Sequence, residues 1–321
     1  MTPRIGVVTN PSSHRNKAGV EDIHAAIAGR PDIVHATLSS MSDLPAILAD
    51  FAARGVGIVV PNGGDGTVVA VLTELFESRP IEPIPRIAVL PRGLTNMIAD
   101  DVGLQGRAAA ALTRLSDTCQ EDAIDRHLVR RRLIRMEGAR GQPAQVGLFF
   151  GTAGLTRAIL ACRKVVQRRG LGAKIAGGMM LAKVLGSNAL GLSGGDDVFR
   201  GDPIDVVLDG DVMDSGTYLM ILVTTLDHML FRSRPFWGTR PGALHYTAVR
   251  YPPRKLLRAI WPLMYGGANR RLPNRDYISE NAGKISLTMS CPFTLDGEMF
   301  EPDPDRPVIL SGDYEAEFIR L

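Results

Sequence analysis

The chain has 321 residues, of which 45% are hydrophobic and 22% are charged, and its formal net charge at pH 7 is +3. This length and apolar content favour two packed domains. The small net charge gives no support for a nucleic-acid partner, and the three scattered cysteines lack the spacing of a zinc site or a disulfide framework.

The first third of the chain alternates short β-like runs with helical periodicity. The β-like runs are 4–9, 33–38, 55–61 and 87–91, and the helical runs are 19–28, 44–53, 67–77, 95–101 and 107–115. Such alternation predicts an α/β domain with a parallel sheet and flanking helices. We place this nucleotide-binding domain at residues 1–122, with 306–321 as a segment that could complete it.

Beyond residue 122 the pattern becomes strand-rich. The β-like runs are 123–137, 145–153, 204–208, 217–226, 244–250, 284–289 and 308–310, and two helical stretches lie at 155–168 and 173–185. Short strands separated by Gly, Pro, Asp and Asn clusters are typical of an antiparallel sandwich. We therefore expect a β-sandwich-rich domain over 123–305.

A glycine-rich segment, Asn62–Thr67, directly follows the predicted strand 55–61 and precedes a helix. Glycines let backbone N–H groups approach an anion, and a helix N-terminus adds partial positive charge. Asp65 would repel phosphates unless a metal ion intervenes, which indicates a metal-bound nucleotide and makes Asp65 the candidate metal ligand. The alternative is a glycine-rich turn in which Asp65 only caps the helix.

Two further polar loops follow predicted strands. The segment Leu90–Asn96 follows the strand 87–91, and Asn10, Pro11 and Ser12 follow the first strand. Ligands of open α/β sheets bind beyond the carboxyl ends of the strands, so the three loops should line one crevice. Taken singly, Thr95 could be only a helix cap, and Asn10-Pro11 only a turn.

Two carboxylates flank a glycine in Asp296-Gly297-Glu298. This spacing puts both side chains on one strand face or in one tight loop. One carboxylate could then hold the other, which leaves a base able to accept a proton from a substrate hydroxyl. The alternative is an Asp-Gly hairpin turn with solvated charges.

Together these motifs resemble the diacylglycerol kinase catalytic-domain family, which includes sphingosine, ceramide and bacterial lipid kinases. The resemblance implies a lipid domain after the nucleotide domain, an active site in the cleft between them, and ATP with Mg²⁺ as phosphoryl donor. It implies Glu298 as the general base, assisted by Asp296. The residues that it implies for nucleotide binding are Gly63, Gly64, Asp65, Gly66, Thr67, Gly93, Thr95 and Asn96.

The chain departs from the family pattern at three places. His14 replaces a glycine in the first loop, Leu94 replaces a threonine, and Val69-Ala70 stands where an Asn-Glu pair is common. These departures bear on catalytic efficiency more than on reaction class. Two alternatives to a lipid kinase stay open: an NAD kinase-like enzyme, which shares the glycine loop, and a non-catalytic nucleotide-responsive protein that binds membranes.

A lipid acceptor requires visits to a membrane surface. The basic pairs Arg163-Lys164 and Arg168-Arg169, and the stretch Arg254–Arg271, mix cations with apolar residues. The second stretch predicts an interfacial helix interrupted at Pro262, or else an ordinary helix packed on the sandwich. We expect a cytoplasmic protein bound peripherally to the inner face of the membrane, since the longest apolar run, Tyr218–Leu226, is about half a membrane span. A homodimer is left open.

Overall fold

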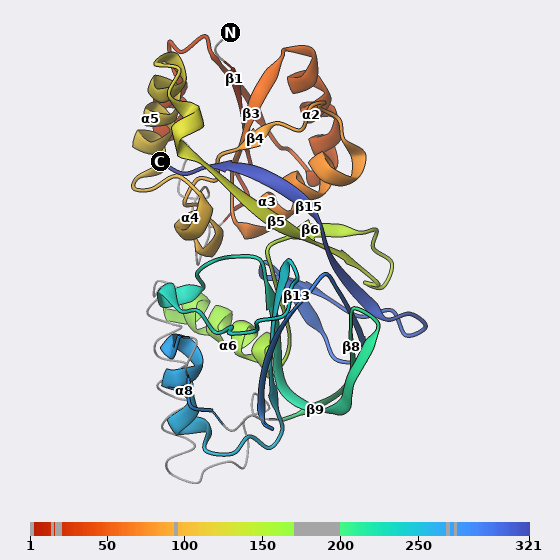
Figure 1. The fold of residues 1–321 in the computed structure, drawn as a ribbon. Helices are drawn as coiled ribbons and strands as arrows, with labels where there is room; N and C mark the ends of the chain where they lie inside the picture. Colours follow the sequence, from red (N-terminus) through yellow and green to blue (C-terminus); the bar gives the residue numbers. More distant parts are fainter. Residues whose placement is uncertain are drawn as a thin grey trace. The chain divides into compact units, whose positions relative to one another are not determined.

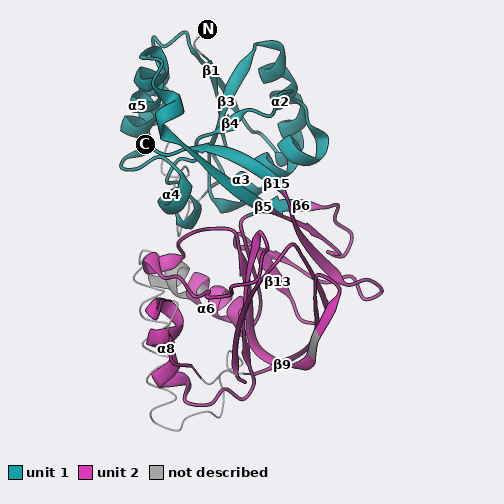
Figure 2. Ribbon diagram, viewed as in Figure 1, with its two compact units in different colours: residues 1–133, 145–147, 314–321 teal, residues 134–144, 148–313 magenta. Residues whose placement is uncertain are grey.

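The computed structural model describes residues 3–13, 16, 21–92, 96–169, 200–267, 270–272 and 275–321. The chain forms two compact units (Figure 2). Unit 1 comprises residues 1–133, 145–147 and 314–321, and unit 2 comprises 134–144 and 148–313. Two strands, β5 (Leu128–Glu137) and β15 (Val308–Ile319), contribute residues to both units.

The central sheet of unit 1 is parallel. Its strands run in the order β15, β4 (Arg86–Ile87), β3 (Val56–Asn62), β1 (Arg4–Thr9) and β2 (Ile33–Thr37), and β5 pairs with β15 and with β6 (Gln145–Gly147). Phe318 of β15 pairs with Ile87 of β4, so the last residues of the chain extend the sheet that the first residues begin. The predicted α/β domain with a parallel sheet is confirmed.

Alternating side chains bury both faces of this sheet. Ile5 and Val7 join a core cluster with the helix α5 (Ala108–Gln120), whereas Gly6 between them leaves room for Phe51 of α2 (Leu44–Ala53). Figure 1 shows α5 and α2 on opposite sides of the sheet. The other helices and turns of unit 1 are α1 (Glu21–Ile27), η2 (Met41–Asp43), α3 (Asp65–Thr73), η3 (Glu74–Ser78), α4 (Met97–Val102) and η4 (Ile124–His127).

Unit 2 is rich in antiparallel strands, as the sequence predicts. Its strands are β7 (Phe149–Ala153), β8 (Asp202–Leu208), β9 (Asp211–Thr224), β10 (Leu244–Arg250), β11 (Tyr277–Ala282), β12 (Lys284–Met289), β13 (Phe293–Leu295) and β14 (Glu298–Phe300). They pair in the order β14-β13-β7-β9-β8-β12-β15, and β10 with β11 branches from β9. The described helical segments are α6 (Gly154–Arg169), η6 (Leu230–Arg232) and α8 (Leu256–Tyr265).

Several sequence-based boundaries need correction. Residues 124–127 form the 3-10 turn η4 and not the start of a strand, and β4 (Arg86–Ile87) overlaps the predicted strand 87–91 at Ile87 alone. Pro262 does not interrupt its helix: α8 continues past it, and Gly266 N donates to Pro262 O at 2.8 Å. The predicted helix at 173–185 lies outside the described residues. No helix within the described ranges is long and apolar enough to cross a membrane.

Candidate functional site

The first loop and the glycine loop leave the same edge of the parallel sheet. Thr9 of β1 pairs with Asn62 of β3, so the residues that follow them emerge side by side. Asn10 N donates to Asn62 O at 3.0 Å, and Asn10 Nδ2 donates to Thr67 Oγ1 at 2.9 Å. The structure thus brings together Asn10 and Thr67, which the sequence analysis placed in one site.

The backbone of the glycine loop is closely packed. Thr67 N donates to Gly64 O at 2.9 Å, which begins the helix α3, and a Cβ added at Gly63 would lie 2.3 Å from Thr67 Oγ1. Asp65 and Gly66 form the first turn of α3, and both are half-buried. The opening N–H groups of a helix attract anions, so this turn suits a phosphate.

The first loop is folded by Asn10. Its Oδ1 accepts a hydrogen bond from Ser12 N at 3.0 Å, and its backbone oxygen accepts one from Ser13 N at 3.3 Å. Pro11 lies in this turn and carries no N–H to satisfy. The loop that holds the predicted site residues Asn10, Pro11 and Ser12 is therefore tied to the glycine loop.

Asn16 is a member of this cluster that sequence reasoning missed. It is 3% exposed, and its Nδ2 donates to Asn10 O at 2.8 Å and to Asn62 O at 2.9 Å. Asn16 thereby holds the ends of the first loop and of β3 together. No periodicity or motif distinguishes this asparagine from an ordinary loop residue, so only its placement reveals it.

A hydrogen-bonded chain leads from the glycine loop to a histidine. Asn62 Nδ2 donates to Thr9 Oγ1 at 3.0 Å, and Thr9 Oγ1 lies 2.9 Å from His35 Nε2. Burial, and then the neighbouring His24, lower the pKa of His35. A neutral His35 can accept a hydrogen bond from the Thr9 hydroxyl, which leaves a lone pair of the Thr9 oxygen to accept the hydrogen bond from Asn62.

The third predicted loop is described only at its ends. Gly93 and Thr95 lie outside the described residues, while Asn96 precedes α4 with a left-handed backbone (φ 54°). Arg92 is largely buried, and its Nη2 lies 2.6 Å from Asp22 Oδ1.

Buried polar atoms without partners gather around these loops. Ser13 Oγ, Asn16 Oδ1, Asn62 Oδ1, Arg92 Nε and Asn96 Oδ1 have no hydrogen-bond partner among the residues that the structure describes. A buried polar atom without a partner usually costs free energy, so a concentration of them requires an explanation. A polar ligand at this edge of the sheet would supply one.

The acidic pair forms a tight hairpin in unit 2. Asp296 (φ 46°) and Gly297 (φ 90°) are the two loop residues between β13 and β14, whose Leu295 and Glu298 pair. Glu298 is exposed, whereas Asp296 is 4% exposed, and its Oδ2 accepts a hydrogen bond from Leu148 N at 2.8 Å. Asp296 thus secures the hairpin, and Glu298 presents a carboxylate to solvent.

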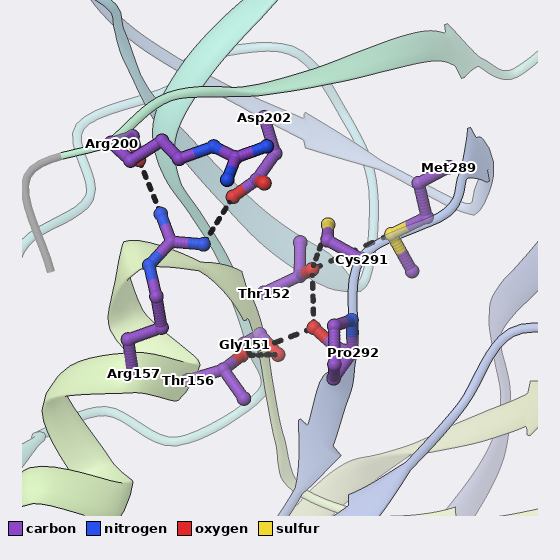
Figure 3. A network of polar contacts seen from close by, with 9 residues as sticks. All are labelled: Gly151, Thr152, Thr156, Arg157, Arg200, Asp202, Met289, Cys291 and Pro292. Atoms are coloured by element: carbon purple, nitrogen blue, oxygen red, sulfur yellow. Dashed lines mark hydrogen bonds and ion pairs between the residues drawn. The ribbon is translucent and has the colours of Figure 1, made fainter. Parts of the chain in front are cut away.

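Two further contacts anchor this hairpin. Arg163 of α6 donates from Nη2 to Gly297 O, so this arginine braces the turn. At the start of β13, Pro292 O accepts hydrogen bonds from Thr152 Oγ1 at 3.0 Å and from Thr156 Oγ1 at 3.3 Å (Figure 3). The side chains of Lys164, Arg168 and Arg169 lie outside the described part of the chain.

The same network fixes α6 to the sheet (Figure 3). Arg157 Nη1 lies 2.6 Å from Asp202 Oδ2, and Cys291 Sγ lies 3.3 Å from Thr152 Oγ1. Burial is the largest cause of the raised pKa of the Cys291 thiol. A neutral buried thiol is a poor nucleophile, so this cluster is a structural support and not a second reactive centre.

Asp125 is an ion-pair partner within unit 1. Its Oδ1 lies 2.6 Å from Arg86 Nη2, in the turn η4 and not in a strand. Arg86 also contacts Glu317, with Nε 3.5 Å from Oε2. The aspartate therefore links β4 to the turn before β5.

The donor atoms near Asp65 are compatible with Mg²⁺. Carboxylate and amide oxygens are its usual protein ligands, and it is commonly held by one or two carboxylates together with substrate phosphates. The described residues contain no group of three or more His, Cys, Asp or Glu that could hold a metal ion. Asp65, together with phosphate oxygens of a bound nucleotide, would fit such a metal ion.

Unit 1 belongs to the class of open α/β domains with a glycine-rich turn between a strand and the helix that follows. Residues 4–125 match the family model of the diacylglycerol kinase catalytic domain. This match confirms, for the N-terminal part of the chain, the family that the motifs resemble.

The relatives agree with this assignment. Over 112 residues the chain is 33% identical to proteins named "Probable lipid kinase YegS-like" from two strains of Pseudomonas aeruginosa. The match spans 33% of this chain and 36% of those proteins, so about a third of each is compared.

Solved structures extend the likeness of the fold. A diacylglycerol kinase from Bacillus anthracis strain Sterne has a TM-score of 0.59 at 15% identity and covers 98% of this chain and 96% of its own. A second structure from that strain has a TM-score of 0.64 at 16% identity, with 98% and 97% covered. At these identities the comparison concerns the fold alone.

Proposed function

We propose that this protein is an ATP-dependent lipid kinase that phosphorylates the hydroxyl of a diacylglycerol-like or ceramide-like lipid. The match of residues 4–125 to the diacylglycerol kinase catalytic domain supports a kinase, and the lipid kinase name of the partial relatives favours a lipid acceptor. The observation that carries the proposal is the linked pair of loops at Asn10 and Gly63, where several buried polar atoms have no hydrogen-bond partner within the described ranges.

In this proposal the loops of unit 1 bind the phosphates of ATP. The backbone N–H groups at the start of α3 would face the phosphate oxygens, and Asn10 would hold Thr67 in place. Mg²⁺ bound near Asp65 would neutralise phosphate charge during transfer. Positioning and charge neutralisation are the main needs of phosphoryl transfer, so these loops supply most of what the reaction requires.

Glu298 of unit 2 would be the general base. It would accept the proton of the lipid hydroxyl while that oxygen attacks the γ-phosphorus, and the β–γ bridging oxygen would leave with ADP. Asp296 would act by holding the hairpin through Leu148 N. The mechanism requires the carboxylate of Glu298 to reach the lipid hydroxyl that attacks the γ-phosphate.

Replacing the base tests the mechanism. Glu298→Gln keeps the size of the side chain and removes its basicity, so kcat with labelled ATP and diacylglycerol in detergent micelles should fall by about 100-fold or more. Glu301→Gln is the matched control, because Glu301 is also an exposed glutamate just beyond the same hairpin. The control should retain near-normal kcat.

The acceptor panel separates the proposal from its rivals. Diacylglycerol, monoacylglycerol, ceramide, a sphingoid base, phosphatidylglycerol and NAD would each be incubated with labelled ATP, and the products separated. A labelled lipid supports the proposal. Labelled product from NAD alone would overturn the assignment of a lipid acceptor. Full turnover by Glu298→Gln would overturn the assignment of Glu298 as the base.

A further inference from the structure

Helix α8 is apolar on two faces. Its inner face packs Ala259 and Leu263 into a core cluster with Leu219, Val249 and Tyr277. Its outer face carries Leu257, Trp261 and Tyr265, which are 37%, 72% and 40% exposed. Residues spaced by four lie on one side of a helix, so these three form a continuous apolar stripe pointing away from the core.

The stripe continues onto a neighbouring turn. Tyr265 Oη donates to Phe231 O at 3.1 Å, and Phe231 of η6 is 42% exposed. The rings of Trp261 and Tyr265 lie 4.8 Å apart between centroids. We call Phe231, Leu257, Trp261 and Tyr265 the α8 patch; three of its four members are aromatic.

The backbone around the α8 patch is held in uncommon conformations. Phe231, Arg232 and Lys255 have φ of 59°, 55° and 54°, a left-handed region that costs about 1–2 kcal/mol for residues other than glycine. Such strain persists where function or surrounding structure requires it. The helix end is also fixed, because Arg270 Nη1 donates to Leu263 O at 2.6 Å and its guanidinium stacks on Trp237. These contacts tie the C-terminal end of α8 to the chain around it.

The charged residues near the α8 patch are mainly cations, although Asp276 lies beside Arg254, with 4.0 Å between Asp276 Oδ2 and Arg254 Nε. The sequence from Met229 to Arg275 contains nine arginines and one lysine and no Asp or Glu, although the whole chain has a net charge of only +3. Three of these cations, Arg254, Lys255 and Arg258, are exposed at the start of α8. Apolar side chains bordered by cations complement a partner that has an apolar interior and anionic groups at its boundary with water.

We propose that the α8 patch and its bordering cations dock this protein on a bilayer of anionic phospholipids. Trp and Tyr rings suit the interfacial region, where an apolar ring and a polar edge are both satisfied, and Lys and Arg attract anionic headgroups. The docking proposal rests on the proposed function in one respect, because docking would bring the kinase to its lipid acceptor. Binding to vesicles does not require catalysis.

Vesicle flotation of the full chain without ATP tests the apolar part. Phosphatidylglycerol vesicles should bind the protein, and Trp261→Ser should weaken binding by about tenfold or more, because the buried area of a large aromatic ring is lost. Val212→Ser is the matched control: Val212 is 76% exposed on β9, outside the α8 patch. The control should bind like the wild type.

The electrostatic part has its own variants. The double variant Lys255→Gln, Arg258→Gln should bind phosphatidylglycerol vesicles about tenfold more weakly at low salt, because two attractions to headgroups are lost. Arg140 is an exposed arginine elsewhere in unit 2, and Arg140→Gln should bind these vesicles like the wild type. Binding to uncharged phosphatidylcholine should be weak, and added salt should reduce binding to phosphatidylglycerol.

A spectroscopic readout locates the contact. In a Trp237→Phe variant Trp261 is the remaining tryptophan, and its emission should shift to the blue and be quenched by lipids brominated on the acyl chains. Unchanged emission with bound vesicles, or equal flotation of Trp261→Ser, would overturn the proposal. So would a change of oligomeric state in Trp261→Ser without loss of vesicle binding, because a second copy would then be the occupant.

Failure of docking and failure of the kinase assignment can be told apart. Trp261→Ser should phosphorylate detergent-dispersed diacylglycerol as the wild type does, with the loss confined to vesicles. A wild-type protein that floats with vesicles but labels no lipid would overturn the proposed function and leave docking supported. A wild-type protein that labels micellar lipid but never floats with vesicles would overturn the docking proposal and leave the proposed function supported.

Discussion

At the scale of single residues, Gly63 and Gly64 of the glycine loop have different structural roles. Gly63 packs against Thr67, where a Cβ would meet three side-chain atoms within 2.8 Å. Gly64, the next residue, has φ of −78°, and the nearest atom to an added Cβ is 4.0 Å away. The first glycine is needed for close packing, and the second is not needed for the fold.

This difference yields a prediction. Gly63→Ala should displace Thr67 from Asn10 and lower the free energy of unfolding of the protein by about 1–3 kcal/mol, as overpacked sites do. Gly64→Ala should change it by less than about 0.5 kcal/mol. Urea unfolding followed by circular dichroism measures both. Equal loss in the two variants would contradict the packing argument.

At the scale of elements, two Asp-Gly hairpins in the described part of the chain have similar backbone conformations. Asp209 and Gly210 have φ of 50° and 90° between β8 and β9, as Asp296 and Gly297 have 46° and 90° between β13 and β14. Both aspartates accept backbone hydrogen bonds, Asp209 from Lys284 N at 2.7 Å and Asp296 from Leu148 N at 2.8 Å. An Asp-Gly pair is therefore a turn signal here, and the glutamate after it distinguishes the candidate site.

The twin hairpins provide a matched pair of variants. Gly297→Ala and Gly210→Ala both force a side chain into a left-handed backbone, so each should lower the free energy of unfolding by about 1–2 kcal/mol. Only Gly297→Ala should also reduce kcat for lipid phosphorylation, because it moves Glu298. Equal kinetic effects of the two variants would argue against a catalytic hairpin.

At the scale of the whole molecule, unit 1 is completed by the far end of the chain. Ala316, Phe318 and Ile319 of β15 are buried, and Ile319 belongs to the core cluster that contains Ile5 and Val7. Further contacts within unit 1 come from Tyr314, whose ring lies 5.3 Å from that of Phe76. The core of unit 1 is therefore complete only when β15 is in place.

Removing one of these side chains should expose that dependence. Phe318→Ala should lower the free energy of unfolding by about 3–5 kcal/mol and speed amide exchange in β1 and β3. Glu315→Ala on the same strand removes only an exposed ion pair with Arg132, at 3.4 Å, and should cost less than about 1 kcal/mol. Protection of β1 that survives Phe318→Ala would contradict the role of β15.

Local pattern was enough to predict the parallel sheet, the strand-rich second part and the loops that follow β1 and β3, because side-chain periodicity and glycine-rich turns are properties of neighbouring residues. The helix 44–53 was predicted with its observed bounds. The turn η4 was read as strand because four residues carry too little periodicity to separate the two.

Local sequence pattern could not predict contacts between distant segments. Asn16 connects the first loop to the end of β3, and Arg163 contacts the hairpin at Gly297. Helix α8 has one apolar face in the core and one in solvent. Each of these features depends on which segments the fold brings together. A side chain's partner is set by packing across tens or hundreds of residues, and nothing in its immediate neighbours encodes that choice.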